Sequence, residues 1–255
     1  MTAAGLAALT LALVQGRHLG TAPTSVLIAV AVASVAGILV RQRRIAHPMI
    51  PPDLLGRRSM RVGLVATFAM TFGTYGLVLI NSIAFAQQRG AGPLATAMQF
   101  TPMPLTYLAL IPVVTVVARR TGPRIAITAG LTTLAGAQLI YGLTGPTASI
   151  WLIETALVLT GAGLAITTGP AVSLALTAVP SERAGLGSGL VNLSRLTGIT
   201  VGTAALGTLF GSGGGVLAAT AVGAGVQAAA GLVSARWGKP EVDTTPTAQK
   251  EASHA

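Results

Sequence analysis

The stretch "SGLVNLSRLTGITVG", residues 188–202, places a permanent cation, Arg195, inside a glycine-spaced apolar segment. An arginine at the centre of a membrane helix costs about 2.5–3.5 kcal/mol on insertion scales. Such a residue needs either a polar partner inside a helix bundle or an aqueous cavity. Which of these applies depends first on whether the surrounding chain lies in a membrane.

The composition of the chain is that of a protein dissolved in lipid. Of its 255 residues, 52% are hydrophobic and only 9% are charged, whereas an average soluble domain has about 25% charged residues. So few charges cannot cover a water-soluble surface of this size, and we expect an all-α, multi-pass membrane protein whose partner is the lipid bilayer. The net charge of +10 does not predict a nucleic-acid partner, because the basic residues form short clusters between apolar runs.

The apolar runs give the number of spans, because about 20 apolar residues are needed to cross the hydrocarbon. Seven runs approach or exceed this length: 25–40, 62–86, 95–117, 125–143, 150–179, 187–209 and 216–233. An eighth run, 1–14, reads as the second half of a span whose first half is missing. A short tilted or interfacial helix is the alternative for that run.

With eight spans, the connecting loops alternate between the two sides of the membrane and their basic residues are very unevenly divided. Only Arg17 and Arg89 fall on one side. Thirteen fall on the other: Arg41, Arg43, Arg44, Arg57, Arg58, Arg61, Arg119, Arg120, Arg124, Arg183, Arg236, Lys239 and Lys250. The positive-inside rule therefore predicts a plasma-membrane (cytoplasmic-membrane) protein with its basic loops and C-terminus in the cytoplasm.

These observations predict four regions. Residues 1–40 hold two transmembrane helices, the first incomplete, and residues 41–61 form a basic cytoplasmic loop. Residues 62–235 form a six-helix lobe. The small, polar and aperiodic segment 236–255 is expected to be a disordered cytoplasmic tail.

The segment "VPSERAGLGSGLVNLSRLTGITVGTAALGTLF", residues 179–210, resembles the penultimate span and preceding loop of the 14-span drug/proton antiporters of the major facilitator superfamily. Three further segments resemble the same family in the same order: "AHPMIPPDLL" (46–55), "QQRGAGPLATAMQFTP" (87–102) and "ARRTGPR" (118–124). The matching positions in the first segment are Pro180, Glu182, Ala184, Gly185, Ser188, Gly189, Leu190, Asn192, Arg195, Gly198, Gly202 and Gly207.

The resemblance implies the C-terminal six-helix lobe of such a transporter, preceded by two linker helices that lie between the lobes in the family. It implies that the complete transporter exports drugs or other small hydrophobic or cationic compounds by alternating access, in exchange for protons. No cofactor beyond the proton gradient and no metal are expected, and the sequence contains no HExxH motif, nucleophile elbow or P-loop that would indicate an enzyme.

The sequence also departs from the family. The N-terminal lobe is absent, and Arg119 stands where the family has an aspartate in the cytoplasmic turn. Since alternating access needs two lobes around a midplane site, we expect this partial chain not to transport alone. A separate N-terminal lobe or a second copy of the chain is the candidate partner, and a non-transporting membrane scaffold or regulatory subunit is the alternative function.

Four polar residues are candidates for the substrate cavity. Arg195 lies about 12 Å deep in its span at 1.5 Å per residue, on the same helix stripe as Asn192. Two interpretations of Arg195 are open, a clamp on backbone carbonyls within the lobe and a lining residue of the cavity. Asn81 and Gln99 are the other candidates, and hydrogen bonding between helices is the alternative for each.

Glu154 is the one acidic residue inside a span and is therefore the candidate proton carrier. The alternative is that its carboxylate reaches the water at the outer surface. Pro102 and Pro170 are expected to break or kink their helices, which is common where transporters line a cavity.

Small-residue spacing and one turn complete the candidate set. The glycine pairs 185/189 and 198/202, that is Gly185, Gly189, Gly198 and Gly202, allow close helix packing, with a hinge as the alternative. The resemblance assigns Gly122, Pro123 and Arg124 to a cytoplasmic gating turn.

Overall fold

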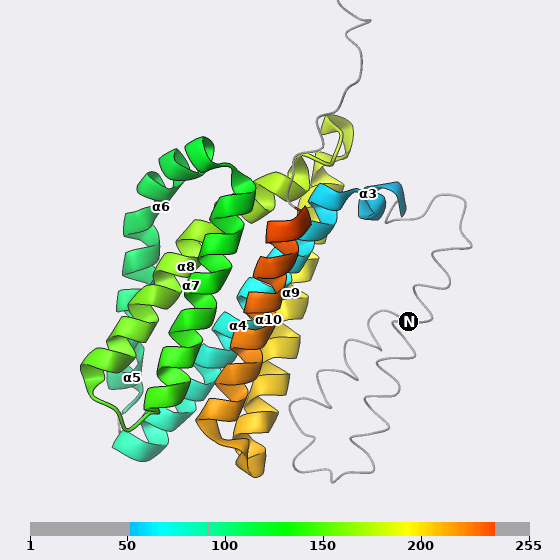
Figure 1. Ribbon diagram of the computed structural model, residues 1–255. Coiled ribbons are helices and arrows are strands. Elements are labelled where there is room, and N and C mark those ends of the chain that lie inside the picture. The colour runs from blue at the N-terminus through cyan, green and yellow to red at the C-terminus, as the bar shows by residue number, and fades with distance from the viewer. Residues whose placement is uncertain (1–51, 91, 238–255) are drawn as a thin grey trace, which may run out of the picture. The chain divides into compact units, whose positions relative to one another are not determined.

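The computed structural model describes residues 52–90 and 92–237 (Figure 1). The two helices expected within 1–40, the loop as far as residue 51 and the tail from residue 238 lie outside the described residues. The chain divides into two units, Met1–Gly56 and Arg57–Ala255. The first unit contributes one short described helix, α3 (Pro52–Gly56), and all that follows concerns the second unit.

The second unit is all-helical, and the described residues contain no strand, which confirms the expected fold class. Five segments are long and apolar enough to cross a membrane, with α5 and α6 counted as one. The elements are α4 (Arg58–Arg89), α5 (Pro93–Gln99), α6 (Pro102–Thr121), α7 (Pro123–Thr144), α8 (Ile150–Leu176), the 3₁₀ helix η1 (Ser181–Arg183), α9 (Ala184–Leu209), the π-helical turn η2 (Phe210–Gly214) and α10 (Gly215–Trp237).

Helix α9 is expected to be a span from its sequence and is a full-length helix, but it is not among the five apolar segments. Asn192, Ser194 and Arg195 lower its mean hydropathy. Such a helix is stabilised in a bilayer by packing its polar side against other helices. Its contacts with α4, described below, supply that packing.

Two helices extend beyond their apolar runs. Helix α4 begins at Arg58, inside the segment predicted to be a loop, and α10 continues to Trp237, inside the segment predicted to be a tail. An apolar run marks only the part of a helix inside the hydrocarbon. The backbone hydrogen bonds continue past it, where long basic side chains reach water.

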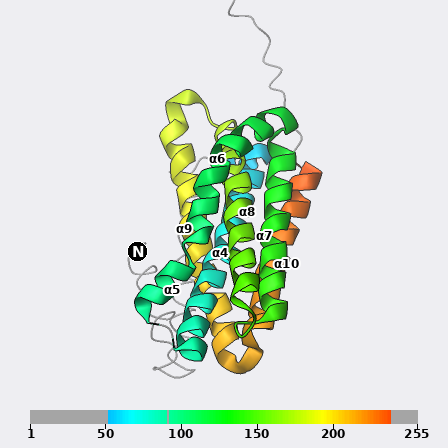
Figure 2. The ribbon, with the colours of Figure 1, turned by 90° about the vertical axis from the view of Figure 1, so that its left-hand side faces the viewer.

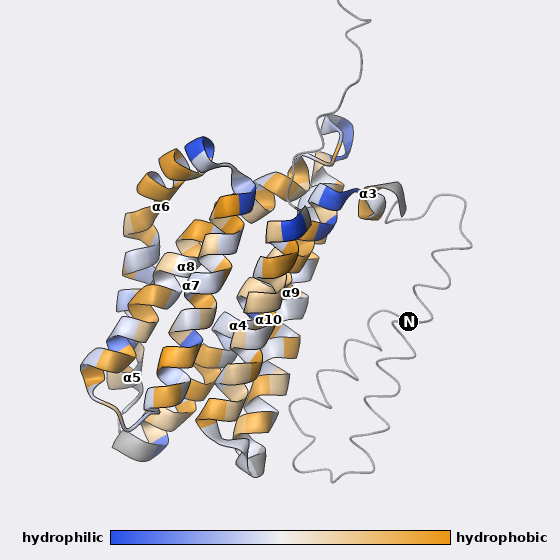
Figure 3. Cartoon of the chain, viewed as in Figure 1, coloured by the Kyte–Doolittle hydropathy of each residue, from blue (hydrophilic) through white to orange (hydrophobic). Residues whose placement is uncertain are grey.

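Consecutive long helices run antiparallel, so the basic residues gather at one end of the bundle. Helices α4, α7 and α9 begin at this end, and α6, α8 and α10 finish there (Figure 1). Figure 3 shows hydrophilic residues concentrated at this end and apolar residues along the helices. The described basic residues concerned are Arg57, Arg58, Arg61, Arg119, Arg120, Arg124, Arg183 and Arg236.

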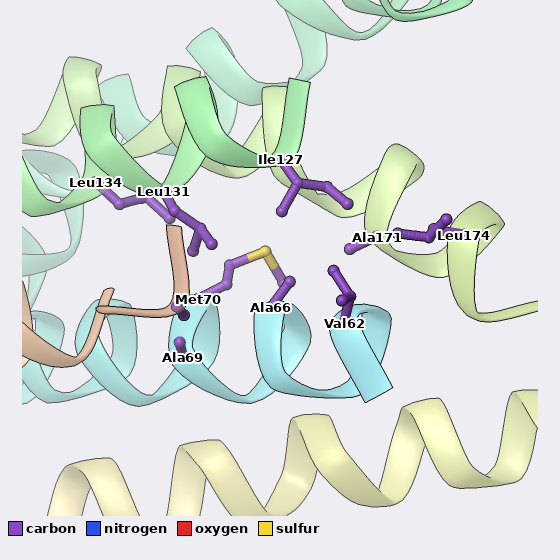
Figure 4. Packing of buried hydrophobic residues seen from close by; sticks show 10 residues of the cluster. Val62, Ala66, Ala69, Met70, Ile127, Leu131, Leu134, Ala171 and Leu174 are labelled. Atoms are coloured by element: carbon purple, nitrogen blue, oxygen red, sulfur yellow. The ribbon is translucent and has the colours of Figure 1, made fainter. Parts of the chain in front are cut away.

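Helix α4 is central, because it packs against α9, α10, α8 and, over a smaller area, α7. Figure 4 shows one buried cluster on its side away from α9, where Met70 points toward Leu131 of α7. A second cluster contains Tyr141 of α7, Ile153 of α8 and Leu206 of α9. Together the two clusters hold α4 between the other helices along its length.

Helix α9 lies very close to α4 because its residues at the contact are glycines, which have no side chain to hold the two backbones apart. A Cβ on Gly198 would collide with the Thr71 hydroxyl, and one on Gly202 would collide with the backbone carbonyl of Phe72. Gly185 and Gly189, by contrast, are exposed and have no neighbour within 4 Å of a Cβ position among the described residues. The close contact is therefore at 198/202 and not at 185/189.

Two short connections determine how helices follow one another. Gly122 joins α6 to α7 at φ +85°, a conformation that favours glycine, and its N–H donates to the Ala118 carbonyl at 2.9 Å. Pro123 then begins α7. The α5–α6 break lies at Phe100 and Thr101, and Pro102, which lacks an N–H, begins α6.

Candidate functional site

A hollow of about 290 Å³ lies between α6 and α9, with α4 and α8 forming its floor. In Figure 2, α6 lies between α9 on one side and α8 and α7 on the other. The volume of the hollow is just below the range of small-molecule sites, roughly 300–1,000 Å³. The lining residues are Met70, Thr71, Thr74, Tyr75 and Val78 of α4, Met103, Pro104 and Tyr107 of α6, Leu164 and Thr168 of α8, and Arg195 of α9.

The lining is mostly apolar, with a few hydroxyl groups. Tyr75 and Tyr107 contribute rings from opposite sides, and Met103 adds a flexible apolar side chain. The Thr74 side chain is buried, and its Oγ1 has no hydrogen-bond partner among the described residues. A largely apolar hollow with few polar groups is the usual composition of a site for a small organic molecule.

Arg195 is the charged residue of this hollow. Its Nε is buried without a hydrogen-bond partner in the described part of the chain. The backbone of this turn is held instead, because Thr71 Oγ1 donates to the Arg195 carbonyl at 3.1 Å and Ser194 Oγ donates to the Leu64 carbonyl at 2.7 Å. The helix is thus anchored on α4, while the guanidinium lines the hollow and has no backbone carbonyl bonded to Nε.

A second hollow, of about 550 Å³, adjoins the first, because Tyr107 and Thr168 line both. It lies between α6 and α8 and extends to the α6–α7 turn. It contains Arg119, the predicted turn residues Gly122 and Pro123, and Pro170. Of the predicted turn residues, the half-buried Arg124 alone does not line it.

The other polar candidates lie elsewhere. Asn81 is buried and its Oδ1 accepts a hydrogen bond from the Tyr141 hydroxyl at 2.8 Å, which joins α4 to α7. Gln99, the last residue of α5, is buried, and its amide has no partner among the described residues. Asn192 is exposed on α9. None of the three lines either hollow.

Glu154 lies in the second turn of α8 and is half-buried. Its Oε2 is buried and has no hydrogen-bond partner within the described residues. It lines neither hollow. Its assignment as a proton carrier stays a prediction.

Sequence reasoning missed the two tyrosines of the hollow. The chain has only three tyrosines, and Tyr75 and Tyr107 both lie within spans, away from the membrane interfaces that this residue prefers. That unusual position was a usable signal. Sequence reasoning also missed a buried pair of amides, in which Gln138 Nε2 donates to Gln227 Oε1 at 3.0 Å.

Residues 63–254 match the sequence pattern of the Major Facilitator Superfamily, which is most of the chain. The chain belongs to the Major Facilitator Superfamily. The resemblance drawn from the four motifs is thereby confirmed, and the chain is an integral multi-pass membrane protein of a transporter superfamily.

Curated relatives of this chain have names that refer to resistance and to transport. It is 30% identical over 204 residues to the multidrug resistance protein Stp of Mycobacterium tuberculosis (strain CDC 1551 / Oshkosh), covering 79% of this chain and 38% of the relative. It is 27% identical over 213 residues to the methylenomycin A resistance protein of Streptomyces coelicolor, covering 81% and 44%.

A third relative is the probable actinorhodin transporter of Streptomyces coelicolor, which is 31% identical over 221 residues, covering 82% of this chain and 38% of the relative. The chain therefore spans about two-fifths of the length of the curated relatives it matches.

Proposed function

We propose that this chain provides the C-terminal lobe of a proton-driven efflux transporter for drugs or other small hydrophobic compounds. The observation that carries the proposal is the Arg195 hollow, which lies between α6 and α9 and is mostly apolar. The names of the relatives, which refer to multidrug resistance and to a transporter, support the same function.

The lobe alone is expected to be inactive. Alternating access requires two lobes that rock around a site at the midplane of the membrane. Here α6 has no buried residue among the described ones, although three of its side chains line the Arg195 hollow. A partner lobe facing α6 and α9 would close the hollow and complete the route.

The direction of transport depends on which side of the membrane the arginine-rich end of the bundle faces. If it faces the cytoplasm, as the positive-inside rule predicts, the second hollow and Arg119 lie on the side from which substrate enters. Proton coupling is assigned to Glu154, because its carboxyl lies within a span and its Oε2 has no protein partner among the described residues.

The experiment compares the chain alone with a chimera in which it replaces the matching segment of the Mycobacterium tuberculosis Stp relative. Both are expressed in cells without other drug exporters, and loss of a preloaded dye is measured with and without a protonophore. We expect no efflux from the chain alone. The chimera should export dye, and the protonophore should abolish that export.

Three results decide between the alternatives. Efflux by the chain alone contradicts the need for a second lobe. If the intact relative is active while the chimera and the chain are both inactive, the scaffold function is favoured. If Glu154→Gln in the chimera leaves the protonophore-sensitive efflux unchanged, Glu154 is not the proton carrier.

A further inference from the structure

We propose that the compound bound in the Arg195 hollow is an organic anion, an aromatic molecule carrying a carboxylate or a similar anionic oxygen. The inference rests on the proposed function, because it names the chemical class of the substrate. The observation behind it is the sign of the charges on the walls of the two adjoining hollows.

Arg195 is a half-buried cation at the wall of a partly open hollow, and the described residues place no carboxylate in that hollow. Its Nε is buried and unpartnered among the described residues, and it is the charged residue of the smaller hollow. A guanidinium binds a carboxylate through two parallel charge-assisted hydrogen bonds, and burial of Nε shields one side of this group from water. The bound compound is therefore expected to supply the negative charge that the described structure lacks there.

The carboxylates of the described lobe lie far from Arg195 along the helices. Glu154 precedes Leu164, a residue of the hollow, by about 15 Å along α8 at 1.5 Å per residue. Glu182 is exposed in η1, in the connection before α9. Neither lines a hollow. The chain's remaining acidic residues lie outside α4–α10: Asp53, Glu241, Asp243 and Glu251.

The second hollow has the same sign. Arg119 lines it, and Tyr107 and Thr168 join it to the first. A compound moving from the basic end of the bundle toward Arg195 therefore passes positive charge at both positions. Positive walls attract anions and repel cations, so the cationic substrates that the family resemblance implies are disfavoured.

The uncharged part of the lining favours an aromatic body for this anion. Tyr75, Tyr107 and Met103 provide ring faces and a polarisable thioether, both of which pack well on aromatic surfaces. The Thr74 hydroxyl is buried and has no partner in the described part of the chain, so it can donate a further hydrogen bond to the ligand.

The test uses three probes that share one ring system and differ only in the charge of the substituent. Naphthoate is anionic, naphthamide is neutral and trimethylnaphthylammonium is cationic. Binding of each to the purified full chain in lipid nanodiscs is measured by calorimetry. We expect naphthoate to bind about tenfold or more tightly than naphthamide, the gain typical of hydrogen bonds to a charged group. The ammonium probe should bind least.

Variants assign this preference to one side chain. Arg195→Gln should remove the advantage of naphthoate over naphthamide, while Arg195→Lys should keep part of that advantage. Arg120→Gln is the matched control, because Arg120 is basic and exposed but lines neither hollow. It should leave all three affinities unchanged.

Equal affinities for the three probes, a preference for the ammonium probe or no naphthoate binding would overturn the inference. If Arg195→Gln does not fold, the comparison of Arg195→Lys with Thr74→Val still decides it, since both must weaken naphthoate binding selectively. Failure of the proposed function is distinguishable. Export of a cationic but not an anionic dye by the chimera refutes only this inference, whereas no export at all, together with Arg195-dependent naphthoate binding, refutes only the proposed function.

Discussion

At the scale of single residues, Arg195 and Asn81 are two polar side chains inside spans with different surroundings. The insertion cost of Arg195 predicts that its side chain faces something other than lipid, and in the structure this side chain lines the hollow. Asn81 looked equally suited to a cavity, but it is bonded to Tyr141 inside the bundle. A lipid-facing side and a core-facing side are both apolar, so hydropathy does not show which way a polar residue in a span points.

The glycines of α9 give a test of close packing. Gly202→Ala should lower the free energy of unfolding by about 1–3 kcal/mol, the typical cost of overpacking, because its Cβ would collide with the Phe72 carbonyl. The measurement is thermal or denaturant unfolding of the full chain in detergent. Gly189→Ala is the control on the same helix and should not destabilise. Equal effects of the two substitutions would contradict the described α4–α9 contact.

The buried amide pair gives a test of coupling between α7 and α10. Gln138→Leu or Gln227→Leu alone leaves the other amide without its partner, which costs about 1–2 kcal/mol of unfolding free energy. The double substitution should cost less than the sum of the two, by about 1 kcal/mol. Double-mutant unfolding measurements check this, and additivity within about 0.5 kcal/mol would show that the two side chains do not interact.

At the scale of elements, the apolar runs predicted the helices well and their ends less well. Helix α4 begins before its apolar run, and the proline-rich span divides into α5 and α6. Hydropathy detects the part of a helix in hydrocarbon, whereas capping glycines and prolines determine where hydrogen bonding stops. Mean hydropathy does not identify α9 as an apolar span. Its polar residues lower this value, because they contact α4 and line the hollow.

The α7–α10 contact can be tested by cross-linking, since the chain has no cysteine of its own. A Cβ on Gly231 would lie 3.6 Å from the Leu131 Cβ, within the range of about 3.5–4.5 Å for disulfides. The double variant Leu131→Cys with Gly231→Cys should therefore cross-link on mild oxidation. A protease site inserted at 177–180 reports the bond, because the two fragments stay joined until reduced.

In the control for this cross-link, the first cysteine is placed at position 136 and not at position 131. A Cβ on Gly136 has no neighbour within 4 Å among the described residues. Gly136→Cys with Gly231→Cys should stay uncrosslinked under the same conditions. Equal cross-linking of both pairs would mean that the helices are not ordered as described.

At the scale of the whole molecule, composition alone was enough for the class of protein, because lipid is the only solvent in which so few charges suffice. The family followed from four motifs and is shown by the match over residues 63–254. The hollows were not foreseeable in position, since each is formed by residues from helices far apart in the chain. Only the three-dimensional arrangement brings Arg195 to Tyr75 and Tyr107.

The most direct measurement of the central claim is the sidedness of the bundle, on which the direction of export depends. Thr121 at the basic end and Thr147 in the α7–α8 connection are both exposed, and each is replaced singly by cysteine. A membrane-impermeant maleimide is then applied to intact cells. We predict labelling of Thr147→Cys in intact cells and of Thr121→Cys only after permeabilisation. Labelling of Thr121→Cys in intact cells would contradict a bundle that crosses the membrane with its basic end in the cytoplasm.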